Sequence, residues 1–122
     1  MKFDIRFDGP SAVMMKAFGL GPRSSSLEVG DDTVQVHMGW GFRATIPRAS
    51  VTAAAQTQRR PLNRGVHGWR GRWLVNGSGK GLVTLTIDPP VRAATMGWPV
   101  QLRELTVSVD APDELVEALA VG

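Results

Sequence analysis

Hydrophobic and polar side chains alternate along several short stretches of this chain, as they do in strands that bury one face. The alternation runs from Lys2 to Asp8, from Val34 to Met38 and from Phe42 to Ile46. Gly30-Asp31-Asp32 stands between Leu27–Val29 and the second of these stretches. Because apolar alternation on both sides of such a turn is typical of paired strands, this part of the chain is predicted to form a hairpin.

The second half of the chain continues the pattern with longer interruptions. Val51–Thr57 is predicted to be a strand and Arg59–Gly68 a polar loop. Trp69–Val75 and Leu82–Ile87 are predicted strands, and the glycine-rich connection between them is of hairpin type. Asp88-Pro89-Pro90 is expected to end the second of them, because proline has no N–H to give to a strand ladder.

The C-terminal part predicts one last strand and one helix, whereas residues 11–18 are apolar without a clear period, so helix and strand both remain open there. Leu105, Val107 and Val109 alternate, and Asp110 or Asp113 can cap the helix that follows. The apolar stripe of this helix consists of Leu115, Val116 and Leu119. Roughly seven or eight short strands and one terminal helix predict a mainly β fold, a small antiparallel barrel or sandwich with the helix over an open corner.

The composition is that of an ordinary globular protein, with 122 residues, of which 43% are hydrophobic and 20% charged. A single domain, residues 1–122, with one core is therefore expected. The chain has no apolar run of transmembrane length, and charges interrupt its first ten residues where a signal peptide needs an apolar core. The absence of cysteine excludes disulfides and thiolate metal sites, and a cytoplasmic location is expected.

Charge is segregated along the chain although the net charge is only +3. No Asp or Glu lies between Thr33 and Ile87, yet this stretch contains Arg43, Arg48, Arg59, Arg60, Arg64, Arg70, Arg72 and Lys80. Arg43 and Arg48 are expected on separate strands and turns. The densest basic segment supplies the candidate anion- or partner-binding residues Arg59, Arg60, Arg64, Arg70 and Arg72. Guanidinium groups bind phosphate and carboxylate in bidentate fashion, so these five predict a surface for an acidic protein or another anionic ligand.

Two interpretations of this segment remain open. In the predicted strand, Arg70 and Arg72 share one face and Trp69 and Trp73 share the other. The simpler interpretation is that the tryptophans pack in the core and the arginines form a solvated face. The functional one is that these arginines join those of the preceding loop to bind an anion. Trp40 and Trp98, each beside glycine, allow a similar choice between plugging the core and anchoring a partner.

The sequence contains no recognisable catalytic or metal-binding pattern. Gly77–Gly81 lacks the spacing of a phosphate-binding loop and is expected to be a turn. His37 and His67 have no carboxylate near them in the sequence, so a metal site is not expected and both are interpreted as solvated. The serines at 24–26 lie outside any nucleophile elbow. The protein is therefore predicted not to be an enzyme and not to need a cofactor or a metal.

Three segments carry a resemblance to a known family. These are GWRGRWLVNGSGKG (Gly68–Gly81), LTIDPPVRA (Leu85–Ala93) and LRELTVSVDAPDELVEAL (Leu102–Leu119). Together with the order of strands and terminal helix, they resemble a family of small uncharacterised actinobacterial proteins with a pleckstrin-homology-like fold. The resemblance implies two orthogonal sheets closed at one corner by a C-terminal helix. It implies no activity, because such folds serve phosphoinositide, phosphopeptide, proline-rich and protein partners alike.

Four functions are compatible with the sequence. The first is a non-enzymatic binding or scaffold module whose basic face meets an acidic protein or other anionic partner. Nucleic-acid binding is the second, since the pI is near 10.2 and aromatic residues stand among arginines. Attachment to an anionic membrane and an enzyme for a phosphorylated small molecule are the third and fourth. Homo-oligomers are compatible with each, because a small sheet with open edges can pair with a copy of itself.

Overall fold

The computed structural model describes residues 1–5, 25–39, 41–56, 65–69, 71–76 and 81–119, and for residues 65–69 and 74–76 it describes the backbone alone. The strands are β1 (Lys2–Asp4), β2 (Ser25–Val29), β3 (Thr33–Met38), β4 (Phe42–Pro47), β5 (Val51–Gln56), β6 (Gly65–Trp69), β7 (Arg72–Asn76), β8 (Leu82–Thr95) and β9 (Trp98–Ser108). A 3-10 turn, η2 (Arg48–Ser50), precedes β5, and the helix α2 (Pro112–Leu119) follows β9.

Strands β1 to β4 form the antiparallel meander that the alternation predicts. In β3 and β4 every second side chain is buried, and in β2 the pattern is the same. The predicted hairpin is confirmed, because Val29 pairs with Val34 and the Gly30 N–H donates to the Thr33 carbonyl at 2.9 Å. The described part of the first strand ends at Asp4, after which Ile5 forms a single bridge to Val109. Residues 6–8, and the ambiguous residues 11–18, lie outside the described residues.

The longest strands, β8 and β9, join the two halves of the sheet. The first half of β8 pairs with β5 and its second half pairs with β4, while β9 follows β8 along both halves. The prediction that Asp88-Pro89-Pro90 ends the strand is wrong. The pairing with β9 shifts between Thr86 and Val91, so both prolines lie in an irregular segment where no ladder donor is required, and the strand continues to Thr95.

Strands β6 and β7 correct three further predictions. Trp69–Val75 is not one strand, because the chain reverses at Gly71, which has a φ of +83°, and Trp69 pairs with Arg72 across the resulting hairpin. Residues 65–68 of the predicted loop belong to β6. β7 also does not pair with β8, because β9 lies between them and runs parallel to β7. Parallel pairing of distant segments leaves no local sequence signal, unlike a hairpin.

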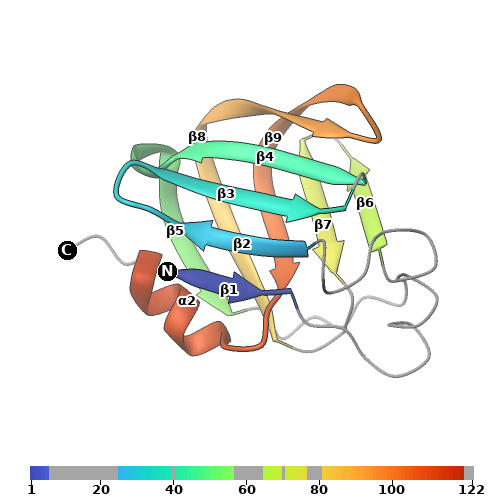
Figure 1. The fold of residues 1–122 in the computed structure, drawn as a ribbon. Helices are drawn as coiled ribbons and strands as arrows, with labels where there is room; N and C mark the ends of the chain where they lie inside the picture. The colour runs from blue at the N-terminus through green and yellow to red at the C-terminus, as the bar shows by residue number, and fades with distance from the viewer. Residues whose placement is uncertain (6–24, 40, 57–64, 70, 77–80, 120–122) are drawn as a thin grey trace.

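Helix α2 has the predicted position and face. Leu115 and Leu119 are buried, Val116 is half-buried, and Glu114 and Glu117 are exposed. The helix packs against β5 and β8. Figure 1 shows it at the lower edge of the sheet, beside β1 and β5.

The described strands form one sheet that is not closed, in the order β1-β2-β3-β4-β8-β9-β7-β6, with β5 beside β8. In Figure 1, β2, β3 and β4 cross in front of the steep strands β5, β8, β9 and β7, so the sheet bends over a core between its two layers. The core holds Phe42, Leu85, Leu105 and other buried apolar side chains. Half-buried Trp73 packs against it, with its ring centroid 6.1 Å from that of Phe42. The mainly β architecture is thus observed, whereas a closed barrel is not.

Candidate functional site

Arg72 is the one predicted site residue that the structure describes, since Arg59, Arg60, Arg64 and Arg70 lie outside the described residues. The side chain of Arg72 is 77% exposed, and its Nε lies 3.6 Å from Oε2 of Glu104. The parallel register of β7 and β9 aligns the two residues. Glu104 lies after the acid-free stretch in the sequence. The fold nevertheless places its carboxylate beside Arg72, which belongs to that stretch. An exposed pair of this kind contributes at most about 1 kcal/mol to stability.

Three other arginines lie on the outer face of the sheet. Arg43 of β4 pairs in register with Ala94 of β8, and directly paired residues share a face. Arg92 stands two residues before Ala94 and pairs with Gln101 of β9, so it belongs to the same face. Arg103 follows Gln101 by two residues. We call Arg43, Arg92 and Arg103 the outer-face arginines; all three are exposed, and none forms an ion pair with a described residue.

Sequence reasoning placed Arg43 apart and did not select Arg92 or Arg103. The latter two lie outside the acid-free stretch, so a search for charge along the chain passes over them. The alternation of Arg92 with buried Ala93, and of Arg103 with buried Leu102, was the available signal. That they share a surface with Arg43 follows only from the pairing of β4, β8 and β9.

Arg103 is held beside the β6–β7 turn. The Gly71 carbonyl accepts hydrogen bonds from the N–H groups of both Arg103 and Glu104, at 2.7 and 3.1 Å. The pairing of β9 with β8 is irregular at Arg103, between Leu102 opposite Val91 and Glu104 opposite Thr86, and neither Arg103 nor Glu104 is buried. The Arg103 side chain lies over Gly71, because a Cβ at position 71 would be 2.9 Å from its Cγ and Cδ.

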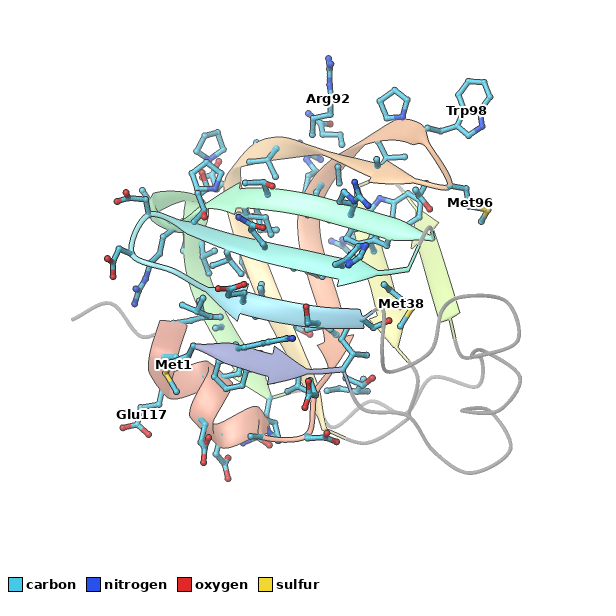
Figure 2. All side chains as sticks on the ribbon, viewed as in Figure 1. Met1, Met38, Arg92, Met96, Trp98 and Glu117 are labelled. Atoms are coloured by element: carbon cyan, nitrogen blue, oxygen red, sulfur yellow. The ribbon has the colours of Figure 1, made fainter. Side chains whose placement is uncertain are left out.

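The tip of the β8–β9 hairpin exposes two large apolar side chains. Met96 is 57% and Trp98 75% exposed, and Figure 2 shows both projecting away from the body of the protein, as does Arg92 further along the hairpin. Met96 and Gly97 have φ angles of 49° and 82°. Turns with two left-handed residues favour Asn and Gly, and an L side chain there costs about 1–2 kcal/mol. An exposed apolar residue in a strained position is more typical of a binding surface than of a stability element.

The tip is anchored to the β3–β4 connection. The Met96 N–H donates to the Gly41 carbonyl at 3.2 Å, and the Thr95 hydroxyl donates to the same oxygen at 2.9 Å. Trp98 is exposed, so it does not plug the core. Trp40 lies outside the described residues.

Two open hollows flank Arg43. One, of about 400 Å³, is lined by Gly39, Arg43, Ala94, Met96 and Gly97. The other, of about 300 Å³, lies over β2, β3 and β4 and is lined by Ser26, Glu28, Gln35, Val36, His37, Arg43, Ala44 and Thr45. Arg43 lines both, so one guanidinium group stands between an apolar and a polar depression.

Among the described residues, His37 is the hydrogen-bond partner of Arg43, with its Nε2 3.4 Å from Nη2 of Arg43. Because guanidinium only donates, this contact uses the lone pair of Nε2. The register also places Asp4, Ser26, His37 and Arg43 in one row across β1 to β4. A serine triad needs histidine between serine and carboxylate, whereas here Ser26 lies between Asp4 and His37. The row therefore lacks the order of a nucleophilic site.

The described part of the chain contains no group of three or more His, Asp or Glu side chains that could hold a metal ion. Arg48 has a structural environment: it donates to the Gly30 carbonyl at 3.2 Å and to the Ala118 carbonyl at 2.7 Å. It thus ties the β2–β3 turn to the end of α2. The side chain of His67 lies outside the described residues.

Comparisons of this chain with protein-family models, with curated protein sequences and with solved structures gave no match. Among the residues described, no helix has the length and apolar character needed to cross a membrane. The site is therefore argued from its own geometry: three outer-face arginines, an exposed tryptophan and two hollows that meet at Arg43.

Proposed function

We propose that this protein is a non-enzymatic binding module whose basic outer face takes an acidic protein partner. One observation carries the proposal: Arg43, one of the outer-face arginines, lines a hollow together with Met96 at an exposed, strained hairpin tip that also presents Trp98. Trp and Arg dominate the binding energy of protein interfaces, and Met is also enriched there. Arginines without carboxylate neighbours are free to pair with the carboxylates of a partner.

Exposed apolar side chains beside the arginines favour an acidic protein over a long polyanion. Met96 and Trp98 are both exposed, and neither offers a charge to a polyanion. A protein partner can bury such apolar groups while its carboxylates pair with the arginines. The five arginines that the sequence predicts are proposed to extend the same basic surface, since Arg103 lies against the turn that leads into Arg72.

A pleckstrin-homology-like architecture belongs to this proposal. It is supported by the steep crossing of the two layers of the sheet and by α2, which packs against β5 and β8 at an open edge. Such folds serve phosphoinositide, phosphopeptide, proline-rich and protein partners, so the architecture is compatible with a binding role. A non-enzymatic role agrees with His37, which contacts an arginine instead of a carboxylate that would orient it as a base.

The test compares three probes at low salt: an acidic peptide of mixed glutamate and leucine, oligonucleotides, and vesicles containing phosphatidylserine. The test variant replaces Arg43, Arg92 and Arg103 by Gln. Its control replaces Ala49, Ala53 and Ala55 by Glu; all three alanines are exposed and lie on η2 or β5, so the net charge falls equally. We expect the Gln variant to lose about tenfold in affinity for the peptide, and the control to lose much less.

A second variant, with Arg59, Arg60, Arg64, Arg70 and Arg72 replaced by Glu, tests whether these arginines extend the surface. Equal peptide binding by wild type and both arginine variants would overturn the proposal. Tighter binding of oligonucleotides or vesicles, with the same dependence on arginine, would replace the acidic protein by one of those partners.

A further inference from the structure

We propose that Arg43 and the hollow beside the Met96–Gly97 turn form one two-part site, which binds a partner segment with a bulky apolar side chain next to a carboxylate. This inference names the feature of the partner that is recognised, and it rests on the binding function proposed above. Its starting point is the position of Arg43 between an apolar and a polar hollow.

The apolar part of the site is the hollow of about 400 Å³. Apart from Arg43, its lining residues are small or apolar: Gly39, Ala94, Met96 and Gly97. The position that a Cβ of Gly97 would occupy has no heavy atom within 4 Å, so the space above the turn is free. The volume lies at the lower end of the range of about 300–1,000 Å³ for ligand pockets, which suits one large side chain rather than a whole cofactor.

Met96 suits the rim of such a hollow. Its side chain is exposed and unbranched, so it can adjust to the shape of an apolar group that enters. The two hydrogen bonds to the Gly41 carbonyl hold the backbone of the tip in place beneath it. The backbone of the turn is therefore held in place, while the Met96 side chain can adjust to a ligand.

The polar part of the site is the guanidinium group of Arg43. Its register neighbours are His37 on β3 and Ala94 on β8, and neither is acidic. Glu28, the acidic residue that lines the polar hollow, pairs in register with Lys2 and Gln35, in the row next to that of Arg43. His37 contacts Nη2 of Arg43, so Nε and Nη1, which have no partner among the described residues, remain as donors for a carboxylate.

A peptide segment fits this arrangement better than a free anion. A small anion would use the donors of Arg43 alone and leave the apolar hollow in water. A side chain of one residue and the carboxylate of the next can occupy both parts together, because Ala94 in the hollow is the direct cross-strand neighbour of Arg43. The apolar contact then adds to a charge contact that is weak when exposed.

The experiment titrates three short peptides into ¹⁵N-labelled protein: one with phenylalanine followed by glutamate, one with alanine for the phenylalanine, and one with glutamine for the glutamate. We expect the first peptide to shift the amide signals of Arg43, Ala94 and Gly97 and to bind about tenfold more tightly than the other two. In Arg43→Gln the preference for glutamate should vanish while the preference for phenylalanine remains.

Ala94→Leu fills the hollow and should remove the preference for phenylalanine while glutamate stays favoured. Gln101→Leu, an equally apolar change at an exposed position of the same face, is the control and should retain both preferences. Urea unfolding confirms that each variant is folded. The inference is overturned if the two preferences do not separate in this way, or if inorganic phosphate gives the same shifts as the first peptide.

The outcome is distinguishable from failure of the proposed function. If acidic ligands depend on Arg92 and Arg103 but not on Arg43, the two-part site is wrong and the binding module stands. If no acidic peptide binds and the triple Gln variant matches wild type, the proposed function fails as well. Concentration-dependent shifts of the same amides without peptide, together with dimers in sedimentation, would show that a second copy fills the hollow and would overturn the inference.

Discussion

Gly71 and Gly97 have nearly the same backbone conformation, with φ angles of 83° and 82°, but their surroundings differ. At Gly97 the space for a Cβ is empty, whereas at Gly71 it is occupied by the Arg103 side chain at 2.9 Å. One glycine is therefore needed for its backbone alone, and the other also for the close approach of Arg103. The two glycines therefore allow the cost of backbone strain to be measured separately from the cost of a steric clash.

Alanine at each of these positions tests this difference. Gly97→Ala is expected to lower the free energy of unfolding by about 1–2 kcal/mol through backbone strain. Gly71→Ala should cost more, because Arg103 must also move, and the excess should vanish when Arg103 is replaced by Ala as well. Urea unfolding monitored by tryptophan fluorescence measures Gly97→Ala, Gly71→Ala, Arg103→Ala and the double variant with alanine at 71 and 103. Equal losses for the two single variants would mean that Arg103 does not rest on Gly71.

Helix α2 is attached to the sheet at both ends by side chains that lie far away in sequence. Gln56 of β5 donates to Asp113 in its first turn, and Arg48 of η2 donates to the Ala118 carbonyl near its end. A cation at a helix C-terminus also interacts favourably with the helix dipole. Because a helix of eight residues is unstable alone, these contacts and the burial of Leu115 hold it in place.

Arg48 and Arg92 are expected to respond differently to the same substitution. Arg48→Met should cost about 1–2 kcal/mol of unfolding free energy, since it removes a charge-assisted hydrogen bond to a helix end. Arg92→Met should change stability by no more than about 0.5 kcal/mol, because Arg92 is exposed and forms no hydrogen bond or ion pair with a described side chain. Thermal and urea unfolding measure both. A destabilising Arg92→Met would assign that residue to the fold instead of the binding surface.

The whole sheet depends most on its central strands. β8 has β9 on one side along its length, and β5 or β4 on the other, whereas β1 is a three-residue strand at one end of the order. Strands β8 and β9 also supply core side chains, among which Leu85, Leu102 and Leu105 are fully buried. The order of the strands therefore predicts an order of local stability.

Hydrogen exchange tests this order. The amides of Val83, Leu85 and Val107 are expected to exchange slowest, at the rate of global unfolding, and those of β1 at least about tenfold faster. Exchange followed by NMR at two denaturant concentrations separates global from local opening. Protection of β1 equal to that of β8 would contradict the order derived from the sheet.

The sequence alone was sufficient for features that depend on near neighbours. Alternation between Val34 and Ile46 determined two strands and their buried faces, and the apolar stripe of Leu115 and Leu119 determined the inward face of the helix. These predictions succeeded because side-chain period and turn chemistry are local. The candidate arginines near Arg72 were selected on local density in the same way, and they remain a prediction except for Arg72 itself.

Distant pairings required the tertiary structure. Glu104 opposite Arg72, β9 between β7 and β8, and Arg43 on one face with Arg92 all arise from register between strands remote in sequence. Alternation states which side of a strand is buried but not which strand lies beside it, because many pairings bury the same apolar face. The chain thus determined its strands, its helix and its apolar face by itself. The partners of its charges, and so the surface proposed for binding, were decided by the packing of the whole sheet.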